Sequence, residues 1–179
     1  MTMDTRWEDI DTLLERTERT KSEGLIKAIA EVAAARYGFP SAEHPSYRTH
    51  VNAPEVSMAV QAGDEQIAPD IVVVEKINTG ETHLIMTAAV ATRDMVNEGE
   101  AKRSWARYAS IPNSVFFLYV PVGYGAVAKK ICKKMKINVA GYRTWRWTPR
   151  GFEVNDISEP MSGLAPLMPP LVRKLLATP

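Results

Sequence analysis

Apolar positions along the chain follow two periods, one typical of helices and one typical of strands. Near the start, two helical stripes separated at Gly24 predict a helix in two pieces, and Gly38 followed by Pro40 predicts its end. The runs 95–111 and 125–136 also place apolar residues at helical spacing, with charges on the remaining positions. We therefore expect helices in all of these stretches.

Other apolar runs predict strands. The run 71–75 is β-branched, and a turn at 78–80 joins it to the long apolar run 82–92, so the two runs predict a hairpin. Further strands are expected at 114–120 and 139–148, with a short extended segment at 56–60. Helices and strands in this order predict an α/β fold in which helices cover a mixed sheet.

Length and composition favour one main domain. The 179 residues, 45% of them hydrophobic, suffice for one core, which we expect over residues 1–148. Prolines recur after it and predict a Pro-rich C-terminal extension over 149–179 that packs on the body or on a partner subunit. The apolar residues 164–176 of this extension would serve a homodimer.

Targeting signals are few. No apolar run approaches the roughly 20 residues of a membrane-spanning helix, so no membrane partner is expected. The single cysteine, Cys132, and a charged start without a signal-peptide core favour a cytoplasmic location. No phosphate-binding glycine loop, nucleophile elbow or histidine metal spacing is present.

The net charge of +1 excludes binding to polyanions through overall charge, so nucleic-acid binding would need a local patch. Such a patch is found over 128–150, which contains eight basic residues and no acid. The candidate nucleic-acid contacts are Lys129, Lys130, Lys133, Lys134, Arg143 and Arg146. Alternatively, the lysines solvate the outer side of a helix while the tryptophans 145 and 147 pack in the core.

The hairpin opens on Pro69 and Asp70, a helical run precedes it, and a helix and a further strand follow. In this order the chain resembles the PD-(D/E)xK nucleases of the restriction-endonuclease-like superfamily, over residues 20 to 147. The resemblance implies a mixed sheet between helices and cleavage of DNA or RNA with Mg²⁺ or Mn²⁺. In that chemistry carboxylates hold the cation, and a lysine offsets the charge of the transition state.

Carried over by position, the family's site is incomplete. Asp70 matches the first acid and is the candidate metal ligand, and Glu31 matches the upstream glutamate, with Glu23 as the alternative. Ala89 stands where the second acid is expected and Ala91 where the lysine is expected. Strand alternation predicts two faces, the first with His83, Ile85, Thr87, Ala89 and Ala91, the second with Leu84, Met86, Ala88 and Val90.

Three explanations of this gap stay open. The fold has lost its reaction and is kept for binding; the missing groups have migrated to Glu75, Glu98, Glu100 or Lys102; or the alanines were engineered. Our leading hypothesis is a restriction-endonuclease-like protein that is catalytically inactive as it stands and retains nucleic-acid binding. The alternatives are a non-catalytic α/β protein-interaction module that forms a homodimer and a divalent-metal nuclease with migrated residues. The cofactor would be Mg²⁺ or Mn²⁺, or none.

Overall fold

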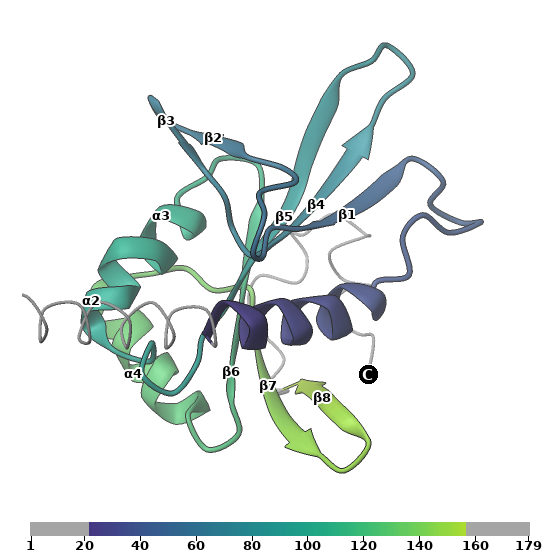
Figure 1. Ribbon diagram of the computed structural model, residues 1–179. Helices are drawn as coiled ribbons and strands as arrows, with labels where there is room; N and C mark the ends of the chain where they lie inside the picture. The colour runs from purple at the N-terminus through teal and green to yellow at the C-terminus, as the bar shows by residue number, and fades with distance from the viewer. Residues whose placement is uncertain (1–21, 157–179) are drawn as a thin grey trace, which may run out of the picture.

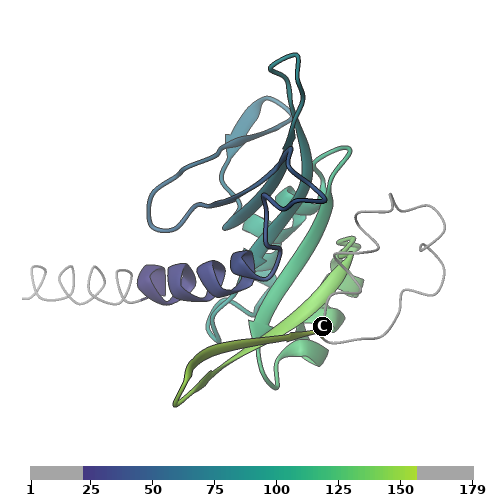
Figure 2. The same cartoon turned by 90° about the vertical axis from the view of Figure 1, so that its right-hand side faces the viewer.

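The computed structural model describes residues 22–156, which form a six-stranded mixed sheet with helices on both faces (Figure 1). In sheet order the strands are β1 (Tyr47–Val51), β4 (Ile71–Lys76), β5 (Thr82–Val90), β6 (Val115–Pro121), β7 (Gly141–Thr148) and β8 (Gly151–Asp156). Neighbours from β1 to β5 are antiparallel, β5, β6 and β7 are parallel, and β8 returns antiparallel to β7. The predicted α/β class is confirmed, and Figure 2 shows how the sheet curls.

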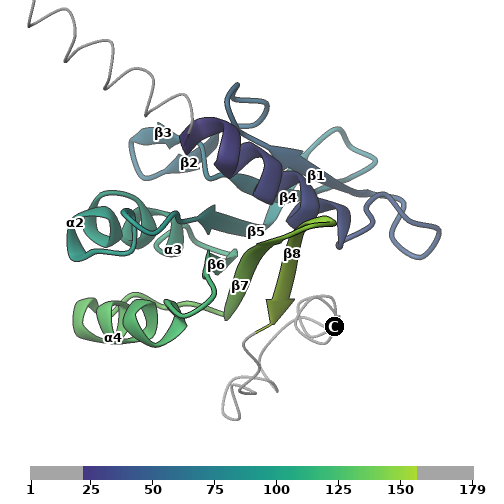
Figure 3. The same ribbon diagram turned by 60° about the horizontal axis from the view of Figure 1, so that its bottom comes forward.

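Each face of the sheet is covered by a different set of helices. The helix at 22–35 packs Ile29, Ala30 and Ala33 on one face. On the other face lie the short helices α2 (Glu98–Glu100) and α3 (Ala106–Ala109), joined by the π-helical turn η1 (Ala101–Trp105), together with α4 (Gly125–Met135). Figure 3 shows these helices apart from the helix at 22–35. Among the described residues, no helix is long and apolar enough to span a membrane.

Burial on both faces explains the central strands. Ile71 and Val73 of β4 contact the helix at 22–35, whereas Val72 and Val74 contact a small hairpin on the opposite face. That hairpin is formed by β2 (Val60–Ala62) and β3 (Glu65–Ile67). A strand that is buried on both sides has no polar face, so its sequence is a continuous apolar run.

The first strand lies elsewhere than predicted. The sequence placed an extended segment at 56–60, whereas β1 spans Tyr47–Val51 and the next strand starts at Val60. β1 is an edge strand, half-buried at every position, and its centre holds Arg48, Thr49 and His50. Only Tyr47 and Val51 at its two ends pack against the core, and three polar residues separate them, which is why the sequence pattern missed this strand.

The predicted faces of β5 are wrong at its first half. Val73 pairs with Met86 and Val74 with Leu84, so the register skips Ile85 and forms a bulge. Leu84 consequently packs with Val74, on the face opposite Met86. From Met86 onward the predicted alternation is observed.

The sheet also continues past residue 148, where the sequence placed the start of the extension. The first residues of that segment form β8, which pairs with β7 from Thr148 opposite Gly151 to Arg143 opposite Asp156. Gly151 has φ +112°, a conformation that favours glycine and closes the hairpin. The rest of the predicted extension, including the apolar 164–176, lies outside the described residues, as do residues 1–21.

Candidate functional site

Asp70 lies directly before β4, beside the end of β5. Its Oδ2 accepts a hydrogen bond of 2.7 Å from the backbone N–H of Val90. The pKa of this carboxyl is raised to about 7, mainly by burial and to a smaller extent by the nearby Glu100, against the lowering effect of the Val90 hydrogen bond. An acid that titrates near neutral pH beside a second carboxyl is typical of functional sites, although structural networks also produce it.

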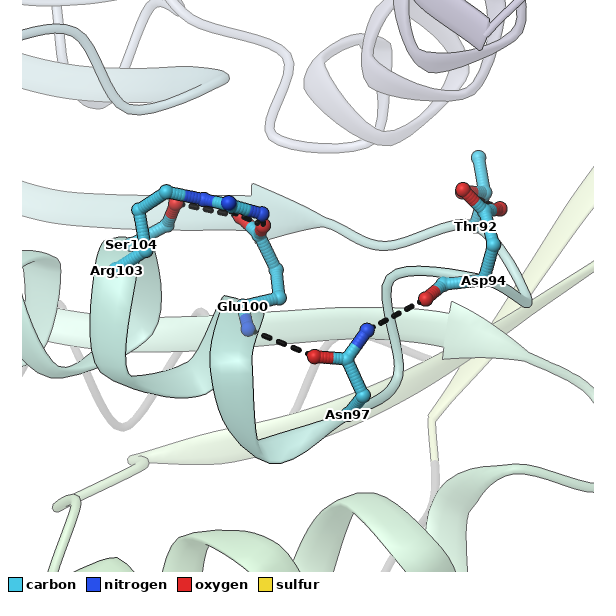
Figure 4. A network of polar contacts seen from close by, with 6 residues as sticks. All are labelled: Thr92, Asp94, Asn97, Glu100, Arg103 and Ser104. Carbon is cyan, nitrogen blue, oxygen red and sulfur yellow. Dashed lines mark hydrogen bonds and ion pairs between the residues drawn. The ribbon is translucent and has the colours of Figure 1, made fainter.

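Glu100 reaches this place from the helix that follows β5. It is 5% exposed, and its carboxylate accepts hydrogen bonds from the guanidinium of Arg103 and the hydroxyl of Ser104 (Figure 4). Residues three and four positions later on a helix lie on the same side, so the local sequence provides both donors. The hydrogen bonds from these two donors replace those that the Glu100 carboxylate would make to water if it were exposed.

The loop before α2 fixes the start of the helix that carries Glu100. Asn97 caps the helix, accepting the N–H of Glu100 at 2.8 Å, and its own amide donates to the carbonyl of Asp94 at 2.6 Å (Figure 4). Thr92 in turn donates to the Asp94 carboxylate at 2.5 Å. This chain of hydrogen bonds connects the end of β5 to the helix that carries Glu100.

Tyr108 of α3 closes the site on a third side. The pKa of its hydroxyl is raised to about 12, mainly by burial and to a smaller extent by the charges of Asp70 and Glu100. Asp70 before β4, Glu100 of α2 and Tyr108 of α3 therefore lie near enough for Glu100 to act on the pKa of Asp70 and for both carboxyls to act on that of Tyr108, while Arg107 and Ser104 act on Tyr108 in the opposite direction.

The donor set suits a hard divalent cation. Two carboxylates are a usual protein contribution to Mg²⁺, whose remaining ligands are commonly water and phosphate oxygens. Asp70 and Glu100 are the residues that would hold such an ion. The described residues contain no group of three or more histidine, cysteine or acidic side chains arranged to ligate a metal.

The motif positions on β5 are part of the core. Ala89 is 3% exposed and Ala91 fully buried, and both pack in a cluster with Trp105 and Leu118. The carbonyl of Ala91 also accepts the indole N–H of Trp145 at 3.0 Å. Apolar side chains and a tryptophan thus occupy the surroundings in which the family places an acid and a lysine.

The predicted upstream glutamate is not brought to Asp70. Glu31 lies on the exposed side of the helix at 22–35, where its carboxylate is 3.9 Å from the amine of Lys27. Glu23, the alternative, is exposed on the same helix.

Of the four migration candidates, all within the described residues, Glu100 is the one that interacts with Asp70. Glu75 accepts a bond from Ser46 at the far end of β4, and Lys102 is exposed on η1.

The α4 lysines form an exposed basic surface. Lys130 and Lys133 point into solvent, and Lys129 lies over the ring of Tyr142, with its amine 5.7 Å from the ring centre. Lys134 bonds the carboxylate of Glu98 at 2.7 Å, which connects this surface to α2. These four lysines are named the α4 basic surface below.

The two arginines lie apart from the α4 basic surface. Arg143 is 2% exposed, and its guanidinium stacks over the rings of Phe117 and Tyr119 at 5.1 and 5.9 Å, on the sheet face opposite α4. Arg146 is exposed and pairs with Glu153 of β8 at 2.8 Å. The strand alternation that buries Trp145 buries Arg143 with it, whereas Trp147 is 68% exposed.

Comparisons with known proteins add no identity, since no family model, curated protein or solved structure matches this chain. The site therefore has to be interpreted from its own residues. Sequence reasoning missed Tyr108 and also Asn52, whose N–H donates to the Asp70 carbonyl at 2.9 Å. The sequence pattern that could have singled out Glu100 is a helical glutamate followed three and four positions later by an arginine and a serine, which can donate to its carboxylate.

Proposed function

We propose that this chain is a restriction-endonuclease-like protein that binds nucleic acid through a divalent cation at Asp70 and Glu100, without efficient cleavage. The observation that carries the proposal is the proximity of these two buried carboxyls: burial is the main cause of the raised pKa of Asp70, and the Glu100 charge adds a smaller contribution. A cation between them would relieve the repulsion that otherwise favours protonation of Asp70.

The order of elements supports the family part of the proposal. A helix, the β4–β5 hairpin, a helix and the strand β6 follow one another along the chain, the order that the resemblance implies. Asp70 directly precedes the first strand of the hairpin, near the place of the first acid in the motif. The strand β1, the small β2–β3 hairpin and β8 are additions to that order.

The α4 basic surface supports nucleic acid as the ligand. It lies next to α2 through the contact of Lys134 with Glu98, two residues before Glu100. Lysines there would contact phosphates near the cation, while a phosphate oxygen would complete the ligands of the ion.

Binding without efficient cleavage follows from the alanines. Phosphodiester cleavage needs a positive group at the transition state, and removing such electrostatic stabilisation costs orders of magnitude in rate. By the resemblance, the lysine that would supply this positive group corresponds to Ala91, which is buried among apolar residues. The absence of an acid at Ala89 removes a further ligand for the cation.

A second candidate is a slow nuclease in which Glu100 replaces the missing acid and Arg103 the missing lysine. The contact of Arg103 with the Glu100 carboxylate favours it, because a guanidinium then lies beside the carboxylate pair. Arginine is a strong partner for phosphate.

One experiment separates these proposals. Labelled single- and double-stranded DNA and RNA are titrated with protein in Mg²⁺, in Ca²⁺ and in EDTA, using wild type, Asp70→Asn and Glu100→Gln. We expect tighter binding with cations for the wild type only, and no cleavage. The matched control Glu31→Gln removes an exposed carboxylate elsewhere and should behave as wild type.

The outcomes are distinct. Equal affinity in Mg²⁺ and EDTA would exclude the cation function. Cleavage in Mn²⁺ that disappears in Asp70→Asn and Arg103→Ala would establish the slow nuclease instead. Lys130→Glu with Lys133→Glu should weaken binding in every buffer and reduce its salt dependence, by a slope of about one for each phosphate that the protein no longer neutralises.

A further inference from the structure

Asn52, directly after β1, is a buried polar residue whose amide is fully hydrogen-bonded. It is 8% exposed. Its Nδ2 donates to the carbonyl of Met58 at 2.7 Å and to that of Pro69 at 2.8 Å. Its Oδ1 accepts the backbone N–H groups of Ser57 and Met58, both at 2.8 Å. Both donors and both acceptor positions of the amide are therefore occupied.

The same residue holds the backbone at Asp70. The β1–β4 pairing ends with Val51 opposite Ile71, so Asn52 and Asp70 stand one step beyond it. There the N–H of Asn52 donates to the Asp70 carbonyl at 2.9 Å, and its side chain holds the carbonyl of Pro69. These two bonds hold consecutive carbonyls at the place where the chain enters β4, and the ring of Pro69 fixes the φ angle of that residue.

We propose that Asn52 is the positioning residue of the Asp70 carboxylate. By fixing the carbonyls of Pro69 and Asp70, it directs the Asp70 side chain at the N–H of Val90 and toward Glu100. The role in cation binding rests on the proposed function, whereas the geometric role does not.

Asparagine is the residue type that this place requires. Aspartate keeps the acceptor for Ser57 and Met58 but loses both donors, so the bond to Pro69 disappears. Alanine loses every side-chain bond and leaves buried carbonyls without a partner. Either change removes the side-chain bond to the Pro69 carbonyl, while the backbone N–H of residue 52 still donates to the Asp70 carbonyl. The backbone before β4 then loses one of its two constraints, and the Asp70 carboxylate is no longer held toward Val90.

The test uses the amide proton of Val90 as a local reporter. Because this N–H donates to Asp70, its chemical shift should change when the carboxyl gains a proton, with a midpoint near pH 7 in the wild-type chain. A pH titration followed by proton–nitrogen NMR measures this. Asp70→Asn should abolish the Val90 titration, which verifies the assignment of the signal.

In Asn52→Ala the Val90 titration should lose most of its amplitude. Asn52→Asp, which keeps the acceptor for the N–H groups of Ser57 and Met58, provides the same test should the alanine variant not fold. The control Val60→Ala removes buried atoms from the β2–β3 hairpin and leaves the hydrogen bonds of the Asn52 amide in place. It should lower the thermal midpoint and leave the Val90 titration unchanged, whereas an unchanged titration in a folded Asn52 variant would overturn the proposal.

Cation affinity gives the second readout. If wild type binds Mn²⁺, Asn52→Asp should weaken that binding about 10- to 100-fold, the range typical of residues that orient metal ligands. Val60→Ala should keep wild-type affinity. If wild type binds no Mn²⁺, the proposed function fails, while the Val90 titration still decides the role of Asn52.

Discussion

The start of β4 and the end of β5 are neighbours in the sheet, but they accommodate charge in opposite ways. Ile71 pairs with Ala88, and the N–H of Val90 donates to Asp70. On the β4 side the buried carboxyl of Asp70 accepts a hydrogen bond from the Val90 N–H. On the β5 side Ala89 and Ala91 fill a dry, apolar cluster.

The difference teaches that a buried carboxyl occurs at this end of the sheet where hydrogen-bond donors contact it, and that apolar side chains fill the places without donors. A buried polar group is tolerated when a hydrogen-bond donor meets it and is costly when none does. Glu100 persists because Arg103 and Ser104 contact it, although it comes from a helix and not from β5. The second buried carboxylate at this end of the sheet thus comes from the element that supplies hydrogen-bond donors for it.

The largest expected effect comes from placing an acid on the apolar side. Ala89→Glu forces a longer, charged side chain against Trp105 and Leu118, which should lower the free energy of unfolding by about 3 to 5 kcal/mol. Urea denaturation measures it. Thr82→Glu, at the exposed start of the same strand, should stay within about 0.5 kcal/mol of wild type. If Ala89→Glu were as stable as the wild type, the cluster around Ala89 would have to admit water to the new carboxylate.

The next effect is the pH dependence that Asp70 imposes. The folded chain keeps the Asp70 proton up to about pH 7, whereas the unfolded chain releases it near the ordinary pKa of 3.8. The folded state therefore binds more protons in this window. Stability should fall by about 2 to 4 kcal/mol as pH rises from 4 to 7, and then level off.

Asp70→Asn isolates this contribution. The variant should lack the decline and exceed wild-type stability above pH 7, as denaturation at a series of pH values would show. Glu100 and Tyr108 face Asp70 and remain in both proteins. His50, whose pKa is lowered by burial and by Lys76, acts in the opposite direction and cancels in the difference. Parallel pH profiles for the two proteins would contradict the raised pKa.

A smaller effect is expected from removing the second carboxylate. Glu100→Gln takes away a negative charge beside Asp70, so the pKa of Asp70 should fall and the pH-dependent loss of stability should shrink by about 1 kcal/mol. Carbon NMR of the Asp70 carboxyl measures the midpoint directly. Glu98→Gln, an exposed change on the same helix, should leave it unchanged. An unmoved midpoint in Glu100→Gln would show that burial alone perturbs Asp70.

The smallest effect is expected for the exposed ion pair between Lys134 and Glu98, whose charges stay in contact with water. Lys134→Ala removes an ion pair whose side chains are 65% and 55% exposed, so stability should change by less than about 0.5 kcal/mol. Thermal unfolding at low and high salt measures it. A larger loss would indicate that the contact of α4 with α2 helps to hold Glu100 in place.

Periodicity alone indicated most of the elements. The helices at 22–35, 98–109 and α4 and the strands β4 to β7 lie in the runs that predicted them, because each buries a regular apolar stripe. The predicted break at Gly24 is wrong, since the helix at 22–35 runs through this residue; an isolated glycine only weakens a helix. β1 and β8 escaped, since these short edge strands each place only two apolar residues on the core, Tyr47 and Val51 in β1 and Phe152 and Val154 in β8. The bulge at Ile85 also escaped, because a one-residue slip depends on the partner strand.

The candidate site divides in the same way. The sequence by itself determined that an acid opens the hairpin, that β5 carries no charge at the motif positions and that Glu100 has a helical arginine and serine beside it. Those are properties of residue type and local spacing. Only the tertiary structure decided that Glu100 faces Asp70, that Arg143 is buried opposite the lysines and that Asn52 holds Asp70. These depend on contacts between residues far apart in the chain, whose distances no local pattern encodes.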